Sequence, residues 1–247
     1  MVVALGSVSA VFVIVVMARS KCSSPVAWKG VGGLSQDARK LSAAIAGVIA
    51  PFLYLILVFG LGFLEPGYNQ MTDMMSILGG VEGLRGWLFN LGVIIIGLLV
   101  AIFGLGLHPF LNDGDGSKVG PSMLVLGGIG LIGGGIFHCD QDCTNFLTRN
   151  PTGIMHMISS ALAGMLIAMS LFVLYFRIRR DPVWERLGGF TLLMALLGNG
   201  AGITLWITFA TTRLSAIEGL IQRVGIIAPL LWIAIVSLQM LSIVRNQ

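Results

Sequence analysis

Charged residues are scarce in this sequence, since only 11% of its 247 residues are Asp, Glu, Lys or Arg. Soluble globular domains carry about 25%, so the composition excludes an ordinary water-soluble fold. Hydrophobic residues make up 56% of the chain, and its mean hydropathy is +0.93. A water-soluble fold of this length leaves exposed about a quarter or more of the surface of the unfolded chain. A chain with so many apolar side chains could not keep them all away from water in such a fold. The composition therefore predicts a protein that lies in lipid.

Several sequence signals of function are also missing. No nucleic-acid-binding motif is present, and the net charge of +4 comes from basic residues in short loops. Membrane topology and anionic lipid head groups account for such residues, so we expect no nucleic-acid partner. The His-Glu-x-x-His run of zinc proteases is absent. We also find no second domain, low-complexity tract or internal repeat.

Apolar runs of about 18 residues are candidate transmembrane helices. The chain contains seven runs near or above this length, at residues 2–17, 41–64, 87–107, 119–137, 153–176, 187–210 and 220–244. The sequence therefore predicts an all-α, polytopic membrane bundle of about seven helices. Glycine is abundant, with 34 residues, and its density at 127–135 predicts that the helix over 119–137 is central and tightly packed.

The first apolar run, at 2–17, has no positive charge before it, so it lacks the usual start of a secretory signal peptide. We expect an uncleaved anchor helix, with a cleaved signal peptide as the alternative. The predicted organisation is an N-terminal anchor and basic cytoplasmic loop at 1–40, followed by a six-helix core at 41–247.

Lysine and arginine counts predict the orientation of the chain. With the N-terminus outside and the C-terminus cytoplasmic, eleven of the fifteen basic residues fall on the inner side. The opposite orientation breaks the positive-inside rule at nearly every loop. We therefore expect a multi-pass protein of the cell membrane, in which Trp87 and Trp184 act as anchors at opposite membrane boundaries.

Most chemically interesting side chains fall at the predicted outer ends of the helices. Ionisable groups there usually face a polar cavity or a partner, and Arg223 and Asp73 are natural candidates to pair across such a cavity. Nitrogen and carboxylate ligands of a divalent metal such as zinc are also available there, and haem is a second candidate cofactor. The predicted metal ligands are His138, Asp140, Asp142 and His156.

A bound metal at this level activates water for hydrolysis. The candidate catalytic residues are Ser76, Asp73, Asp140 and His156, and the candidate cofactor-binding residues are Arg223 and Asn90. Each has a plainer interpretation as a solvated loop residue, a helix-end hydrogen bond or, for Asn90, an interhelical hydrogen bond. Cys139 and Cys143 form a disulfide, a metal pair or two free thiols, and the outward placement favours the disulfide.

Ordered motifs along the chain resemble the domain of unknown function 998 family of multi-pass membrane proteins, over about residues 41–244. They are Pro66-Gly67-Tyr68, Ser76-Ile77-Leu78-Gly79, Trp87-Leu88-Phe89-Asn90, Gly135-Ile136-Phe137-His138-Cys139-Asp140 and His156. The resemblance implies a six-helix core and leaves the first helix outside it. It implies no activity.

Three functions are compatible with the sequence. The first is a metal-assisted hydrolase or transferase that acts on a lipid in the outer leaflet. The second is a non-catalytic accessory subunit that packs against other membrane subunits or binds a lipid or pigment. A transporter ranks third, because paired broken helices and a charge near the bilayer midplane are missing. Membrane lipids are expected partners in each case.

Overall fold

The computed structural model describes residues 36–114, 116–139, 150–211 and 213–246. All of its regular elements in these ranges are helical. The long helices are α2 (Gln36–Leu55), α5 (Leu84–Leu107), α6 (Val119–Ile136), α7 (Pro151–Ile178), α8 (Gly188–Thr211) and α9 (Glu218–Arg245). The α2 helix contains Pro51 and continues through a wide π-helical turn, η1 (Ile56–Gly60), into the short α3 (Leu61–Leu64).

Six helical stretches in the described residues are long and apolar enough to cross a membrane. The prediction of an all-α, multi-pass membrane bundle is thereby confirmed for the six-helix core. The first of these stretches begins at Asp37, before the predicted start at residue 41. The seventh predicted run, at 2–17, and the loop that follows it lie outside the described residues. Which membrane holds the bundle, and the division at residue 40, stay predictions.

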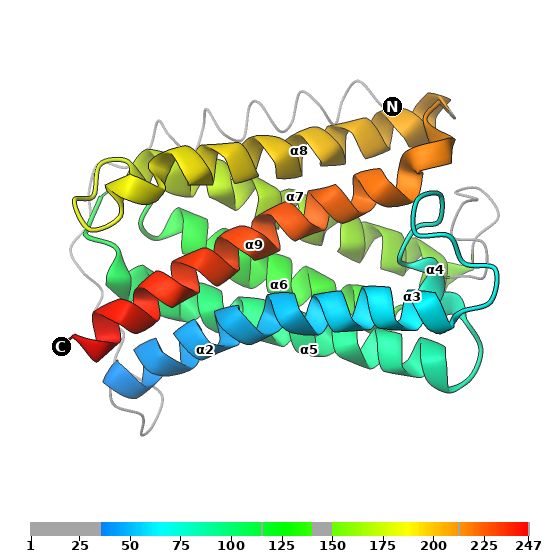
Figure 1. The fold of residues 1–247 in the computed structure, drawn as a ribbon, viewed down its shortest axis with the longest axis horizontal. Coiled ribbons are helices and arrows are strands. Elements are labelled where there is room, and N and C mark those ends of the chain that lie inside the picture. Colours follow the sequence, from blue (N-terminus) through cyan, green and yellow to red (C-terminus); the bar gives the residue numbers. More distant parts are fainter. Residues whose placement is uncertain (1–35, 115, 140–149, 212, 247) are drawn as a thin grey trace.

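The six long helices form a closed ring in which successive helices pack side by side and α9 returns to pack against α2 (Figure 1). The helices alternate in direction. The short α4 (Ile77–Gly80) therefore lies at the same end of the bundle as α3 and the first turns of α9 (Figure 1). This end is called the α4 end, and the opposite one, where α9 finishes, is called the C-terminal end.

Glycines bring α5 and α6 into backbone contact. A Cβ atom on Gly97 would lie 2.6 Å from the Gly128 carbonyl oxygen, and one on Gly128 would lie 2.5 Å from that of Gly97. These separations are shorter than any ordinary Cβ contact, so only glycine fits on either side. The predicted tight packing of the glycine-rich helix is confirmed, and the glycines of α6 serve helix contact.

Buried polar groups link the helices through the apolar interior. Trp232 on α9 is fully buried, meets the Phe103 ring edge-on at 6.2 Å between ring centroids, and donates a 2.9 Å hydrogen bond to the Thr191 hydroxyl on α8. The Asn199 amide donates a 2.8 Å bond to the Ala168 carbonyl on α7. Side-chain hydrogen bonds of this kind fix neighbouring helices where no water competes.

A buried ion pair closes the C-terminal end. Arg177, in the last turn of α7, lies 3.1 Å from the carboxylate of Asp181, which is fully buried. The same carboxylate accepts hydrogen bonds from the backbone and side-chain amides of Asn112, at 3.3 and 3.0 Å, and from the Val183 N–H at 3.1 Å. Every partner is supplied by the protein, so this cluster is a structural clamp.

Trp184 belongs to the same clamp, and its predicted role as a membrane-boundary anchor is wrong. The side chain is fully buried, and its indole N–H donates a 3.0 Å bond to the Phe110 carbonyl. Trp87, by contrast, is 60% exposed, as an anchor requires. A position near a helix end therefore does not distinguish an exposed anchor from a buried tryptophan, because Trp184 is covered by other parts of the protein.

Basic residues are unequally divided between the two ends of the described bundle. Arg85, Arg213 and Arg223 belong to element ends at the α4 end, whereas the larger group lies at the C-terminal end. This segregation matches the predicted charge bias. Which end faces outward, and hence the orientation of the termini, stays a prediction.

Candidate functional site

The 65–83 loop, which contains α4, is attached to the first turns of α9. The Leu220 N–H donates to the Met71 carbonyl at 3.0 Å, and the Met75 N–H donates to the Gln222 side-chain oxygen at 2.7 Å. The Tyr54 hydroxyl on α2 donates to the Met75 sulfur at 3.2 Å. The loop is thus held between the first and last helices of the ring.

Arg223 is the buried cation of this end. It lies on α9 and is only 3% exposed. Its guanidinium donates to the Asp73 carbonyl oxygen at 2.9 Å and to the Tyr68 hydroxyl, and it stacks over the Tyr68 ring at 5.6 Å from the centroid. All of these partners are neutral. Among the described residues Arg223 has no carboxylate partner, although a buried charge normally has one.

The expected approach of Arg223 to Asp73 is present, but it is made through the backbone of Asp73. The Asp73 carboxylate is turned back into its own loop, where it accepts a 2.9 Å bond from the Asn69 N–H and a 2.7 Å bond from the Thr72 hydroxyl. These local bonds shape the turn that presents the Asp73 carbonyl to Arg223. The carboxylate therefore stabilises the loop and leaves the arginine charge uncompensated.

Three buried polar atoms of Arg223 and Gln70 have no hydrogen-bond partner among the residues that the structure describes. They are the Nε of Arg223 and both side-chain atoms, Oε1 and Nε2, of the Gln70 amide. Gln70 and Tyr68 pack on the same backbone, because a Cβ on Gly62 would collide with the Gln70 amide and approach the Tyr68 ring to 3.0 Å. The Tyr68 hydroxyl in turn bonds Arg223. The side chains of Arg223, Tyr68 and Gln70 are called the Arg223 cluster below.

The protonation of Tyr68 matters for this cluster. Burial raises the pKa of its phenol, while the neighbouring Arg223 charge acts in the opposite direction. The phenol is therefore neutral at pH 7. It accepts a bond from the guanidinium, and its own proton is directed to the Asp73 carbonyl at 3.4 Å.

His156 lies near the start of α7. Its Nδ1 is 2.8 Å from the Gly134 carbonyl and 2.7 Å from the Phe137 carbonyl, at the end of α6. A carbonyl oxygen only accepts, so Nδ1 carries the proton and Nε2 does not in the neutral ring. The Ser160 hydroxyl lies 3.5 Å from Nε2. His156 thus satisfies two backbone oxygens that the end of α6 leaves unpaired.

The proposed metal ligands are only partly described. His138 is exposed and its Nδ1 lies 3.2 Å from the Cys139 carbonyl, whereas Asp140 and Asp142 fall outside the described residues. Within the described ranges, no three His, Cys, Asp or Glu side chains gather closely enough to hold an ion. Cys139 is buried against Met74. Cys143 lies outside the described residues, so the predicted disulfide stays a prediction.

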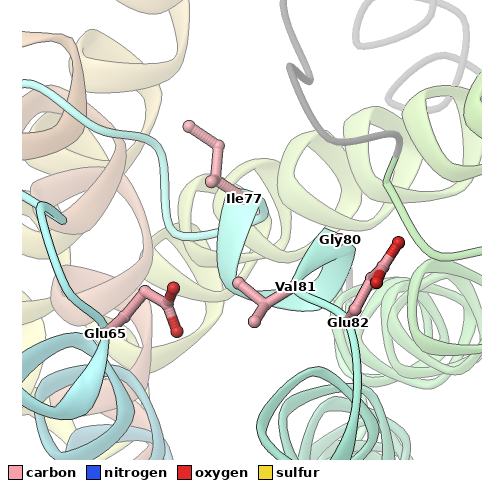
Figure 2. A pocket seen from close by; sticks show the side chains of 5 residues that line it. All are labelled: Glu65, Ile77, Gly80, Val81 and Glu82. Carbon is pink, nitrogen blue, oxygen red and sulfur yellow. The ribbon is translucent and has the colours of Figure 1, made fainter.

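Asn90 and Ser76 border the loop. The Asn90 side-chain amide donates a 2.9 Å bond to the Gly79 carbonyl of α4, which ties α5 to the loop. Ser76 immediately precedes α4 and is half-buried. A cavity of about 310 Å³ opens beside them, lined by Glu65, Ile77, Gly80, Val81 and Glu82, with the two carboxylates on either side of Val81 (Figure 2). None of the predicted site residues lines this cavity.

The predicted shared hollow stays a prediction, and its described members have different hydrogen-bond partners at the α4 end. Arg223 and Asp73 meet in the Arg223 cluster, whereas His138 and His156 lie around the end of α6. Sequence reasoning missed Tyr54, Tyr68, Gln70 and Gln222. The sequence feature that indicated polar partners here was Arg223 within the apolar run at 220–244, because a cation in such a run requires polar side chains or carbonyl groups around it.

Architecture and site together define a multi-pass helical membrane protein with a buried cation at one end of the bundle. The chain belongs to the family described as protein of unknown function (DUF998), which matches residues 48–239. The family resemblance predicted from the sequence motifs is thereby confirmed. No curated protein and no solved structure matches the chain.

Proposed function

We propose that this protein is a non-catalytic lipid-binding membrane protein, and that the Arg223 cluster receives the anionic head group of the lipid. The observation that carries the proposal is the buried guanidinium with only neutral partners and an unpaired Nε. A buried charge without a counter-charge is costly, and a bound anion removes that cost.

The position of the cluster favours a lipid as the source of the anion. Arg223 lies near the start of the membrane-crossing stretch Ser215–Arg245, and Tyr68 and Gln70 lie in the loop that follows the stretch Asp37–Leu64. Lipid head groups occupy this level of a membrane. The unpaired atoms are covered, so a head group enters only when the 65–83 loop lifts from α9.

Binding of lipid to the purified protein tests the proposal. We expect the wild-type protein in detergent to bind an anionic phospholipid in preference to phosphatidylcholine. Arg223→Gln should weaken binding of the anionic lipid roughly tenfold or more, since a hydrogen bond to a charged group contributes about 1.5–3 kcal/mol. Arg213→Gln, which removes an exposed arginine at the same end, is the matched control.

Two further measurements keep this test decisive. Size-exclusion chromatography and thermal unfolding show whether Arg223→Gln is folded, and Arg223→Lys keeps the charge if the glutamine variant is not. Unchanged preference for the anionic lipid in a folded Arg223→Gln protein overturns the proposal.

A metal-assisted hydrolase or transferase acting on lipid is the second candidate. Its support is the orientation of His156, whose Nδ1 proton is held by backbone carbonyls, the arrangement that metal-bound histidines commonly use. Metal analysis of the purified protein, compared with His156→Ala, tests this candidate. Protein without bound metal, and a variant that hydrolyses lipid as the wild type does, count against it.

A further inference from the structure

The Gln70 amide gives the Arg223 cluster a second chemical requirement. Both Oε1 and Nε2 are buried without a hydrogen-bond partner in the part of the chain that the structure describes. A simple anion satisfies only donors, which here are Gln70 Nε2 and Arg223 Nε. The Oε1 atom is an acceptor, and it stays unpaired unless the ligand also carries a donor.

The neighbouring charges decide which donor suits this place. The ligand atom that meets Oε1 must lie close to the anion, because Gln70 and Tyr68 share the surface over Gly62 and Tyr68 bonds Arg223 directly. An ammonium donor next to a buried guanidinium is repelled. A hydroxyl group donates without adding charge, so it is the matching donor.

Resting on the lipid-binding function proposed above, we propose that the Arg223 cluster selects a phosphate ester that bears a hydroxyl group, that is, a polyol phosphate head group. Phosphate oxygens accept from Arg223 Nε and Gln70 Nε2. The hydroxyl donates to Gln70 Oε1. All three unpaired atoms of the cluster are then satisfied by one ligand.

Two lipids with the same charge separate this inference from simple anion binding. Phosphatidylglycerol and phosphatidylethanol are both singly charged phosphodiesters, and only the first has hydroxyl groups on its head. We expect wild-type protein in detergent to bind phosphatidylglycerol about fivefold more tightly, the ratio that one net hydrogen bond produces. Equal affinity for the two lipids overturns the inference and leaves the lipid-binding function intact.

The side chain is tested by Gln70→Leu. This variant should bind the two lipids equally, and it should bind both more weakly than the wild type binds phosphatidylethanol, because the phosphate also loses the Gln70 Nε2 donor. Gln239→Leu, toward the other end of α9, is the control and should keep the preference. A folded Gln70→Leu protein that still prefers phosphatidylglycerol overturns the assignment to Gln70, and if the variant does not fold, the wild-type ratio alone decides.

A soluble probe distinguishes the source of the head group. Glycerol phosphate should compete with phosphatidylglycerol only at far higher concentration if the acyl chains contribute to binding. Competition at equal concentration identifies the free polyol phosphate as the ligand and contradicts its origin in a lipid. Anion binding that persists in folded Arg223→Gln is a different failure, because it overturns the proposed function itself.

Discussion

The two ends of the bundle each bury an arginine, and the two arginines have opposite surroundings. At the C-terminal end, Arg177 meets the buried Asp181 carboxylate, which is itself fully hydrogen-bonded. At the α4 end, Arg223 is buried more deeply and meets a carbonyl, a phenol and an aromatic ring. Arg177 is thus part of a buried ion pair, whereas Arg223 is buried without a counter-charge among the described residues.

The physical difference lies in what removal of each cation leaves behind. Without Arg177, a carboxylate stays buried with no positive partner, which is strongly destabilising. Without Arg223, the groups left behind are neutral, and Tyr68 and Asp73 still bond each other. We therefore expect stability to depend on the first arginine, and the proposed ligand binding on the second.

The largest expected effect is on folding at the C-terminal end. Arg177→Met should lower the free energy of unfolding by about 3–5 kcal/mol, because Asp181 loses its counter-charge. Arg223→Met should lower it by less than about 1 kcal/mol, because removal of a buried charge without a counter-charge offsets the loss of its hydrogen bonds to neutral partners. Thermal and chemical unfolding in detergent measure both. Equal losses in the two variants break the comparison.

The next effect converts one environment into the other. Gln70→Glu places a carboxylate in the Arg223 cluster and so supplies the counter-charge that Arg177 already has. We expect the ligand-free protein to be more stable and its affinity for anionic lipid to fall about tenfold, the ratio that corresponds to about 1.4 kcal/mol. Lipid binding and unfolding temperature are measured on the same preparation. Unchanged affinity shows that this side chain does not face the anion.

A smaller effect concerns Tyr68. Its raised pKa means that folding favours the neutral phenol, so its contribution to stability is complete below the ordinary tyrosine pKa of about 10. That contribution is lost as pH rises from there through the folded-state value. Tyr68→Phe should cost about 1 kcal/mol at pH 7, from the lost bond to Arg223. Unfolding temperatures between pH 8 and 11 should converge for the two proteins, and a constant difference contradicts this expectation.

The smallest effect is expected at Arg85, a third kind of arginine. It pairs with Glu65 at 3.3 Å but its side chain is 43% exposed. Such surface pairs contribute about 0–1 kcal/mol, and salt screens them. Arg85→Gln should therefore leave both the unfolding temperature and the anionic-lipid affinity near their wild-type values. A large fall in affinity would mean that the summed charge of the basic residues at the α4 end, and not Arg223 alone, attracts the anion.

Much of the fold could be predicted because the apolar runs match the helices closely. The run at 119–137 corresponds to Val119–Ile136, and the run at 220–244 to Glu218–Arg245. Lipid requires all backbone groups to be bonded within each segment, so length and hydropathy suffice. The ring order of the helices was not predictable, since contact between α2 and α9 depends on packing that no local pattern records.

The candidate site was predictable only in part. Arg223 stood out because a cation within an apolar run is unusual, and its approach to Asp73 was expected. Its partner Tyr68 lies 155 residues away in the sequence. The Pro66-Gly67-Tyr68 motif indicated the family but not this contact. The ion pair between Arg177 and Asp181 could have been predicted from the sequence, because opposite charges four residues apart can meet at a helix end. The metal set was predicted from residue types alone and stays a prediction, because Asp140 and Asp142 lie outside the described residues.

The closed ring has a consequence for biosynthesis. Because α2 finds its second neighbour only when α9 arrives, the earliest helix of the core waits in the membrane until the latest one is inserted. Arg223 enters with α9, so the proposed anion site is assembled only after that helix has been inserted. A nascent chain stopped before Glu218 carries the 65–83 loop without its support and lacks the arginine that we propose receives the head group.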